Sequence, residues 1–443
     1  MVYLSRLSLT NFRNLAQLEL ALPAGVVVFF GANAQGKTTL LEAVYLLAIA
    51  RSFRAENERE VVNFQAAAQG EPALVGGTVE KKGERISIYV GYQSALGQPL
   101  HSPPSQGGGK EVPSPPLQRG ARGDFQKGVR EDSRAPRDDS PTYSVRKQIR
   151  VSRMRRTAAE LVGVMGAVLF SADDIELVYG SPAERRRYLD ILISQSDPLY
   201  IKALQRYQRV VQQRNQLLRL LREGRAKEAE LDFWDRELVR EGTWITWQRQ
   251  EAIRLLSRLC AQHHQELSGS EAELHIEYRP TVPQGDSLQD TENRFLESLA
   301  AFRQRELATA TTVVGPHRDD FKLLSNGMDM GTFASRGEAR TLALTLRLAE
   351  AAYLALARGD EPIVLLDDVL SEMDASRRRR VLERVTHYQQ ALITTTDLEL
   401  VRGFFGPAAT YFRVGEGQVI PLAENAEVPA QETGTPAAEE DMG

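Results

Sequence analysis

The residues best suited to chemistry lie in a short stretch that begins at Gly31. The stretch reads Gly-Ala-Asn-Ala-Gln-Gly-Lys-Thr, which matches the phosphate-binding pattern G-x-x-x-x-G-K-[ST]. Glycines let such a loop wrap around an anion with its N–H groups pointing inward. The lysine can pair with the β- and γ-phosphates, and the threonine hydroxyl can ligate Mg²⁺. The stretch predicts a nucleoside triphosphate site that consists of Gly31, Ala32, Asn33, Ala34, Gln35, Gly36, Lys37, Thr38 and Thr39.

Two predicted elements would hold this loop in place. Residues 25–30, Gly-Val-Val-Val-Phe-Phe, are apolar and β-branched, which is typical of a buried strand. Residues 40–50 are predicted to form a helix whose positive N-terminal end would face the phosphates. Ala34 stands where many phosphate loops have glycine, so the backbone there must accept a side chain.

Residues 362–368 form a second, acidic motif. The apolar run Pro-Ile-Val-Leu-Leu predicts a short strand that ends in Asp367 and Asp368. In phosphate-loop ATPases, the first carboxylate at such a strand end holds Mg²⁺, and the next can orient or deprotonate the attacking water. We therefore predict that Asp367 and Thr38 form the metal shell, and that Asp368 is the catalytic base beside the catalytic Lys37.

A third motif, Ser335-Arg-Gly337-Glu338, opens a long predicted helix. A serine and a glycine at a helix start can form another anion-binding N-terminus, although an ordinary capped core helix begins in the same way. Ser-Glu-Met-Asp374 follows the acidic strand. The next predicted strand ends at Thr395 and Thr396.

The order of these motifs resembles that of the ABC-type ATPases. In that family the signature serine and glycine, here Ser335 and Gly337, close onto the γ-phosphate that the other subunit binds. Asp374 would belong to the D-loop, which crosses the dimer interface. The strand that ends at Thr395 or Thr396 would carry a threonine where transporters usually have a switch histidine. Because the chain has one phosphate loop and one signature, the resemblance implies a head-to-tail homodimer around two ATP molecules.

Composition is that of an ordinary globular chain, with 443 residues, 42% hydrophobic and 26% charged. No apolar run approaches the roughly 20 residues of a membrane span, and the N-terminus does not resemble a secretory signal. The single cysteine, Cys260, lies in a helical pattern and is predicted to be buried. These features predict a cytoplasmic protein without a membrane contact.

The net charge of −4 gives no global sign of nucleic-acid binding. Local clusters could be solvated faces or phosphate contacts, namely Arg146-Lys147, Arg150, Arg153-Arg155-Arg156, Arg185 to Arg187 and Arg377 to Arg380.

The periodicity of the chain predicts an α/β fold with an inserted, mostly helical lobe, and the resemblance implies that the α/β part is an ABC-type phosphate-loop ATPase head. The helical lobe shows apolar residues at helical spacing, with a break at Glu223-Gly224 that suggests a helical hairpin. Pro, Gly and charge dominate two further segments, which we predict to be a disordered insertion between neighbouring strands and a disordered acidic tail. The predicted division is 1–175 for the first part of the ATPase lobe, with the insertion at 94–142, then 176–305 for the helical lobe, 306–422 for the second part of the ATPase lobe, and 423–443 for the tail.

Beyond these motifs the chain resembles the RecF family of bacterial recombination-repair ATPases, which belongs to the SMC-like ABC group. The most specific matching segments are GSPAERRRYLD (180–190), GPHRDD (315–320) and LLDDVLSEMD (365–374), supported by LTNFRNL (9–15). The resemblance implies a weak DNA-stimulated ATPase that dimerises with ATP and hydrolyses it slowly. It implies binding to gapped and single-stranded DNA and to junctions between single and double strands. It also implies action with RecO and RecR to help load RecA, in replication restart and the SOS damage response.

The resemblance also suggests residue roles. Arg13 and Asn14 would lie near the nucleotide, so Arg13 joins the predicted ATP-binding residues. His317 and Arg318 in GPHRDD could take part in a strand-end polar network or act on the ATP side, and both interpretations stay open. The arginines at 185–187 could contact DNA or order the helical lobe.

Two other functions use the same phosphate loop. A transport ATPase subunit would normally carry a switch histidine and a signature with paired glycines and a glutamine, which this chain lacks. A nucleotide kinase would not need an ABC-type signature. Both alternatives are therefore disfavoured against an ATP-gated DNA-binding clamp.

Overall fold

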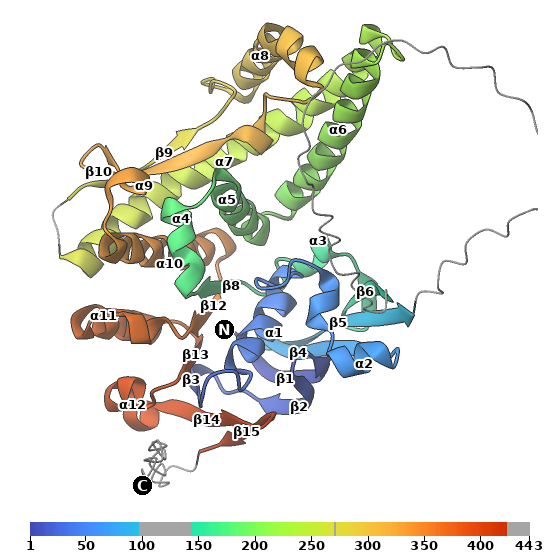
Figure 1. Ribbon diagram of the computed structural model, residues 1–443. Helices are drawn as coiled ribbons and strands as arrows, with labels where there is room; N and C mark the ends of the chain where they lie inside the picture. Colours follow the sequence, from blue (N-terminus) through green and yellow to red (C-terminus); the bar gives the residue numbers. More distant parts are fainter. Residues whose placement is uncertain (97–142, 270–271, 423–443) are drawn as a thin grey trace, which may run out of the picture.

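The computed structural model describes residues 1–96, 143–269 and 272–422 (Figure 1). The predicted tail, 423–443, and most of the predicted insertion, 97–142, therefore lie outside the described residues. Two six-stranded sheets form the ATPase lobe, and the long helices of the helical lobe lie above them in Figure 1.

The first sheet is antiparallel, with strand order β2-β1-β4-β5-β6-β7. Its N-terminal strand alternates buried and accessible positions, as the pattern YLSRLSL predicts for a half-buried strand. Strand β5 continues three residues into the predicted insertion and pairs antiparallel with β6, so the segment 97–142 connects two neighbouring strands. The strands are β1 (Val2–Phe12), β2 (Leu15–Ala21), β4 (Ala73–Lys81), β5 (Glu84–Leu96), β6 (Tyr143–Val151) and β7 (Met154–Arg156).

The second sheet holds the strands that precede the predicted phosphate loop and end in the predicted acidic motif. Its order is β15-β14-β3-β13-β12-β8, and all neighbours except β15 and β14 are parallel. Parallel strands buried on both faces read as continuous apolar runs, which is why Gly25–Phe30 and the residues before Asp367 lack alternation. The strands are β3 (Gly25–Phe30), β8 (Ala167–Phe170), β12 (Ile363–Asp367), β13 (Gln390–Thr395), β14 (Ala409–Gly415) and β15 (Gln418–Pro421).

Helix α1 (Lys37–Ile49) lies between the two sheets and contacts β4 and β5 on one side and β8, β12 and β13 on the other. It is buried nearly all round, as a helix enclosed by two sheets must be. Alternate residues of β3 serve two cores: Val27 and Phe29 pack in the core around α1, and Val28 packs in the core under the helical lobe. The phosphate loop thus lies between two rigid elements, β3 and α1.

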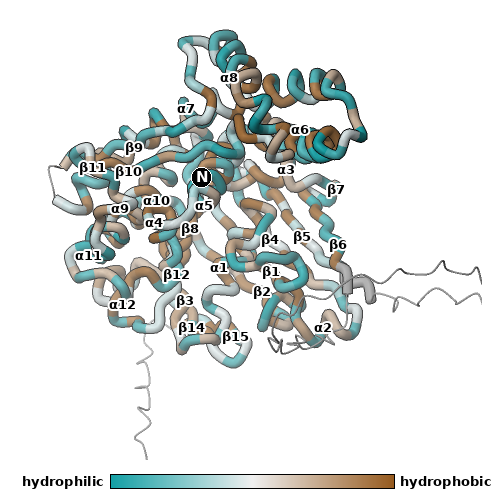
Figure 2. Tube along the Cα trace, turned by 45° about the horizontal axis from the view of Figure 1, so that its top comes forward, coloured by the Kyte–Doolittle hydropathy of each residue, from teal (hydrophilic) through white to brown (hydrophobic). Residues whose placement is uncertain are grey.

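The helical lobe contains the predicted hairpin. Helices α6 (Pro198–Arg222) and α7 (Leu231–Ser268) pack together, and the turn at Glu223-Gly224 separates them. Figure 2 shows hydrophilic and hydrophobic turns alternating along α6 and α8, as expected for helices with one buried face. Cys260 on α7 is fully buried, as predicted, and burial raises the pKa of its thiol.

Other parts of this lobe differ from the predicted division. Helix α8 (Leu288–Thr309) runs past residue 305, so the predicted boundary falls inside a helix. Strand β9 (Leu274–Arg279) pairs with β10 (Asp320–Ser325), and β10 pairs with β11 (Met328–Asp329), so one small sheet joins the lobe to the segment after it. Across the described ranges, every helix is too short or too polar to traverse a lipid bilayer.

The signature helix α10 (Arg336–Arg358) connects the two lobes. It contacts α7 on one side and β8 on the other, and it lies between them in Figure 1. The remaining helices are α2 (Phe64–Ala68), α3 (Ala158–Leu161), α4 (Glu176–Tyr179), α5 (Pro182–Ser196), α9 (Met330–Phe333), α11 (Ala375–Val385) and α12 (Glu399–Phe405). Short 3₁₀ turns are η1 (Glu58–Val61), η2 (Ala172–Ile175), η3 (Glu228–Glu230), η4 (Pro316–Arg318), η5 (Val369–Glu372) and η6 (Gly406–Ala408).

Candidate nucleotide site and signature face

The phosphate loop depends on its two glycines for its shape. A Cβ atom at Gly31 would lie 2.2 Å from the carbonyl oxygen of Val414, so only glycine allows β14 to approach this closely. Gly36 has φ 103° and precedes the first turn of α1. Ala34 has φ 63°, which confirms that its backbone accepts a side chain in the left-handed region.

Lys37 is buried at the start of α1, where its ammonium group lies over the loop. Its Nζ donates to the carbonyl oxygens of Gly31 at 2.7 Å and Ala32 at 2.8 Å. An ammonium group has three protons, so these two bonds leave one for a ligand in the loop. Burial lowers the pKa of Lys37, while the carboxylates of Asp368 and Asp367 oppose that shift. The lysine therefore lies within the electrostatic reach of both predicted acidic residues.

Thr38 and Asp367 meet, as the two motifs predict. The Thr38 hydroxyl donates to Asp367 Oδ1 at 2.8 Å, although 329 positions separate the two residues. Thr394 donates to the same oxygen at 2.8 Å. In the parallel register of β12 and β13, Asp367 and Thr394 are direct partners, which explains the contact. Thr394 was not predicted as a partner of Asp367. The switch position predicted at Thr395 or Thr396 is a different role and stays a prediction.

Asp368 differs from its neighbour because one of its oxygens is left without a partner. It has φ 53°, and its N–H donates to Thr394 Oγ1 at 3.0 Å. Among the described residues, no group donates to its buried Oδ1. Burial raises the pKa of Asp368, with Lys37 opposing the shift and Asp367 adding to it. A half-buried carboxylate with a raised pKa and a buried oxygen that lacks a donor is suited to accepting a proton.

Arg13 lines the same cavity as the loop, but its guanidinium is already paired. It donates to the fully buried Glu42 of α1, with Nη2 to Oε1 at 2.7 Å. Thr39 donates to Asn14 Oδ1 at 3.0 Å, so Arg13 and Asn14 of the LTNFRNL segment both contact α1. The pairing of Glu42 with Arg13 was not predicted, because the helical pattern around Glu42 does not distinguish it from an ordinary helix residue. Gln35 accepts from the Glu416 N–H and so ties the loop to the turn after β14.

These side chains surround a cavity of about 860 Å³. It combines loop residues with Asp368 and with a wall that includes the exposed Phe64. A volume of this size suits a nucleotide. The residues that line it are Arg13, Asn14, Asn33, Ala34, Gly36, Lys37, Thr38, Thr39, Arg54, Glu60, Val62, Asn63, Phe64, Gln65 and Asp368.

The signature face begins at Ser335, where α10 starts as predicted. The Ser335 side chain caps this helix, as in an ordinary capped helix, and its role as a signature stays a prediction. Its Oγ accepts from the Glu338 N–H at 3.3 Å, and the Glu338 carboxylate accepts from the Ser335 N–H at 2.8 Å. This reciprocal capping box fixes the first turn of the helix. Ser335 and Gly337 are both exposed, so this helix start lies on the surface of the single chain.

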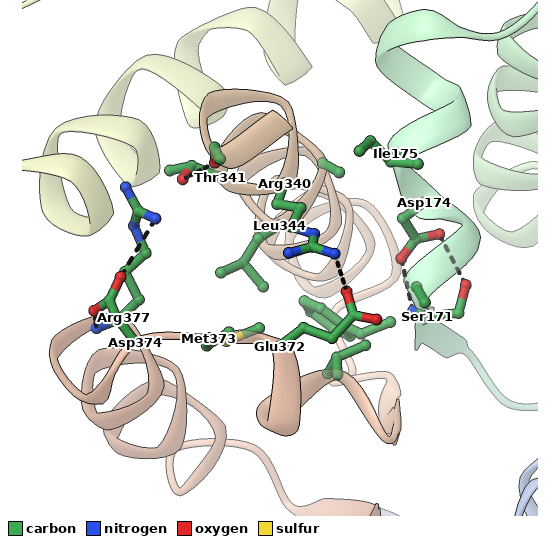
Figure 3. Close-up of a pocket in the computed structure, with 15 residues that line it drawn as sticks. Ser171, Asp174, Ile175, Arg340, Thr341, Leu344, Glu372, Met373, Asp374 and Arg377 are labelled. Atoms are coloured by element: carbon green, nitrogen blue, oxygen red, sulfur yellow. Dashed lines mark hydrogen bonds and ion pairs between the residues drawn. The ribbon is translucent and has the colours of Figure 1, made fainter. Parts of the chain in front are cut away.

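A second cavity, of about 290 Å³, lies beside the signature (Figure 3). Apolar side chains such as Leu344 and Met373 line it, and Figure 3 shows an ion pair of 3.0 Å between Arg340 of α10 and Glu372 of η5. That ion pair joins the signature helix to the segment that follows Asp368.

Asp374 and Gly337 line this second cavity together, so the structure brings the predicted D-loop and signature to one surface. Asp374 caps α11, where its Oδ1 accepts from the Arg377 N–H at 2.9 Å, and this bond holds its pKa below the ordinary value. The two cavities share no lining residue. The phosphate loop and the signature therefore line different cavities of the chain.

The GPHRDD segment takes part in a polar network at the foot of the helical lobe. His317 Nδ1 lies 2.7 Å from the Tyr207 hydroxyl, and its Nε2 lies 3.0 Å from the Thr312 carbonyl oxygen. Burial lowers the pKa of His317 to about 4. Arg318 also contacts the Thr312 carbonyl. Neither residue lines the phosphate-loop cavity, which favours the polar-network interpretation.

The basic clusters divide into two kinds. Those on α5 and α11 are largely engaged: Arg185 makes a bidentate pair with Asp320, and Arg380 donates to two carbonyl oxygens at the end of α7. On the β6–β7 hairpin, Lys147 pairs with Glu58 and Arg156 pairs with Glu160. The other arginines of this hairpin are exposed and make no hydrogen bond or ion pair within the described part of the chain, namely Arg146, Arg150, Arg153 and Arg155. For these four, a solvated face and phosphate contacts both stay open.

Comparison with known proteins agrees with this geometry. A family model described as "AAA domain" matches residues 6–98. A protein of Herpetosiphon aurantiacus named "DNA replication and repair protein RecF" is 40% identical over 95% of this chain and 100% of its own length. The protein of the same name from Geobacillus thermodenitrificans is 32% identical over 94% of this chain and 99% of its own.

A solved structure agrees over the same extent. It is described as the recombination mediator protein RecF-ATP in the RecFOR pathway, is 29% identical, and superimposes with a TM-score of 0.77 over 95% of this chain and 98% of its own. The predicted ABC-type ATPase fold is thereby confirmed. The chain therefore belongs to the RecF family of DNA replication and repair proteins.

Proposed function

We propose that the chain binds Mg²⁺ and ATP at the phosphate loop, that ATP joins two copies head to tail, and that the closed dimer grips DNA. The observation that carries this proposal is the separation of the two cavities. One holds the phosphate-binding groups, and the other holds the signature and D-loop on the surface of the same chain. A second copy would complete each site by facing its Ser335 toward the bound γ-phosphate.

The residues at the end of β12 fit Mg²⁺. Thr38 Oγ1 and Asp367 Oδ1 are 2.8 Å apart and are both hard oxygen donors. Within the described chain, no three His, Cys, Asp or Glu side chains gather into a metal cage. Mg²⁺ commonly uses one or two protein ligands together with substrate phosphates and water. Thr38 and Asp367 would hold the ion, which would neutralise phosphate charge when bound.

Hydrolysis would use Asp368. Its buried Oδ1 lacks a donor and its pKa is raised, so it can take a proton from a water that attacks the γ-phosphate. Lys37 would stabilise the charge on the phosphate oxygens. We propose a slow, DNA-stimulated turnover that releases the dimer.

DNA binding would use the exposed arginines of the β6–β7 hairpin. These arginines would contact the phosphates of gapped, junction or single-stranded DNA. The named relatives place the family in replication and repair and in the RecFOR pathway. We therefore propose that this chain acts with RecO and RecR to help load RecA at gaps.

The test measures dimer mass by light scattering and DNA retention on duplex, single-stranded and gapped substrates, each with and without ATP and Mg²⁺. ATP should produce a dimer and should raise retention of gapped DNA above that of blunt duplex. A monomer in saturating ATP, or retention that ignores ATP, would refute the gating proposal.

A further inference from the structure

A third cavity, of about 440 Å³, lies where the two lobes meet. Its walls come from the end of α1, from α5 and α6, and from Arg249 on α7, with His317 at one side. Helix α1 has 13 residues, so at 1.5 Å per residue this cavity lies ~20 Å along the helix from the phosphate loop. It is therefore separate from the proposed ATP site.

The cavity has a large excess of positive charge. Four arginines line it, while Asp190 is its only acidic lining residue in the described chain. Asp190 is already committed, since its Oδ1 accepts from Tyr200 and from Arg249 at 2.8 Å. The arginines are Arg51, Arg186, Arg187 and Arg249.

Nearby carboxylates do not balance this charge. Asp320 is held by the bidentate pair with Arg185, and Asp319 accepts from Tyr278 and Thr281. Asp319 also forms a long ion pair of 3.9 Å with Arg249, so it is shared with the arginine that Asp190 already holds. Among the described residues, the hydrogen bond made by Arg186 goes to the backbone carbonyl oxygen of Asp319 and not to a carboxylate. Burial and the neighbouring Arg249 charge lower the pKa of Arg186, and the charges of Asp320, Asp319 and Asp190 oppose that shift.

Arg187 is half-buried beside this group and makes no hydrogen bond or ion pair within the described residues. A guanidinium presents a planar fork of donors that matches the oxygens of a phosphate. The cavity also has apolar walls, formed by Ile49, Val162, Ile191, Ile201 and Leu204. Apolar walls with a few charged groups and a volume of this size are typical of small-ligand sites.

We propose that this junction cavity binds the phosphate group of a nucleotide unit, with Arg187 and Arg186 as its charged contacts and the apolar wall against the sugar or base. The phosphate could belong to a free mononucleotide or to the phosphorylated end of a DNA strand. Both sources present the same chemistry to the arginines. The site is independent of the proposed ATP-driven dimer, so its failure would leave that proposal intact.

The first test uses the full chain with Lys37→Met, which removes phosphate binding at the loop. Calorimetric titration with dAMP should show binding, and deoxyadenosine, which lacks the phosphate, should bind about ten-fold more weakly or not at all. Arg187→Glu in the same background should weaken dAMP binding by about ten-fold or more. Arg222→Glu, an exposed arginine near the end of α6 that lines none of the cavities described, changes the net charge equally and should have no effect.

The second test identifies the source of the phosphate. It compares a 5′-phosphorylated oligonucleotide with its 5′-hydroxyl form, by fluorescence anisotropy with each variant. A preference for the phosphorylated form that Arg187→Glu removes assigns the site to DNA ends, whereas an Arg187 effect on dAMP alone assigns it to free nucleotides. Thermal melting checks that Arg187→Glu and Arg187→Gln are folded. If the folded Arg187→Glu variant binds both dAMP and the phosphorylated oligonucleotide as tightly as its parent, the proposal is overturned.

Discussion

The phosphate-loop cavity and the signature cavity differ in how complete they are in one chain. In the first, Lys37, Thr38 and Asp367 already contact one another or the loop, and Asp368 has a free buried oxygen. In the second, an exposed capped helix start and an exposed D-loop border an apolar hollow. We propose that the first cavity supplies the groups for binding and hydrolysis, and that the second supplies groups that complete another copy's site. Substitutions in the first cavity should therefore abolish nucleotide binding, whereas substitutions in the second should abolish dimer assembly and leave nucleotide binding intact.

The largest effect should come from Lys37→Met. The substitution removes the ammonium that lies over the loop, so ATP binding, dimerisation and ATP-dependent DNA retention should all be lost. Fluorescent-nucleotide titration and light scattering measure the first two. Dimerisation by this variant with ATP would show that the loop does not control assembly.

Ser335→Arg should affect dimer assembly without affecting nucleotide binding. A bulky cation at the exposed helix start should block the dimer, and hydrolysis should fall with it. ATP affinity should stay within about two-fold of the parent chain, because this face shares no residue with the phosphate-loop cavity. Equal loss of ATP affinity would show that the two cavities are not independent.

Asp368→Asn should affect hydrolysis alone. Removing a general base typically costs about 10²–10⁴-fold in rate, while ATP binding and dimerisation should persist. A base must be ionised to act, and burial raises the pKa of Asp368, so the rate of the parent chain should fall on acidification at a pH above the ordinary aspartate value of about 4. A pH–rate profile measures this limb. An acidic limb at the ordinary aspartate position would argue against Asp368.

The smallest effect should come from Arg340→Ala. It removes the 3.0 Å ion pair with Glu372 that joins the signature helix to η5. Both side chains are partly exposed, so the loss of stability should be at most about 1 kcal/mol. Dimer formation should weaken a few-fold, as seen in the ATP concentration needed for half dimerisation. Arg379→Ala, which removes the exposed Arg379–Glu383 pair on α11, is the matched control.

Local patterns predicted much of this site. The apolar run of β3, the glycines at Gly31 and Gly36 and the start of α10 at Ser335 each depend on a few residues, so the sequence shows them directly. The capping pair of Ser335 and Glu338 was not predicted. The meeting of Thr38 with Asp367 was predicted because a phosphate loop and an acidic strand end share a metal ion in phosphate-loop ATPases.

Contacts set by tertiary pairing were harder to predict. Thr394 reaches Asp367 only because β12 and β13 align in a particular register, and nothing in the local sequence fixes that register. Glu42 pairs with Arg13 across the core, which helical periodicity does not reveal. The end of α8 at Thr309 was also missed, since its helical pattern continues through the predicted boundary.

A mixture of Lys37→Met and Ser335→Arg tests directly whether two copies of the chain share each ATP site. A heterodimer of Lys37→Met with Ser335→Arg has one intact composite site, which pairs the loop of the second chain with Ser335 of the first. If the site is shared between copies, the mixture should regain ATPase activity, up to about half that of the parent dimer, although each variant alone is inactive. If each site lies within one chain, the mixture will stay as inactive as its components, and the account of a shared site will be contradicted.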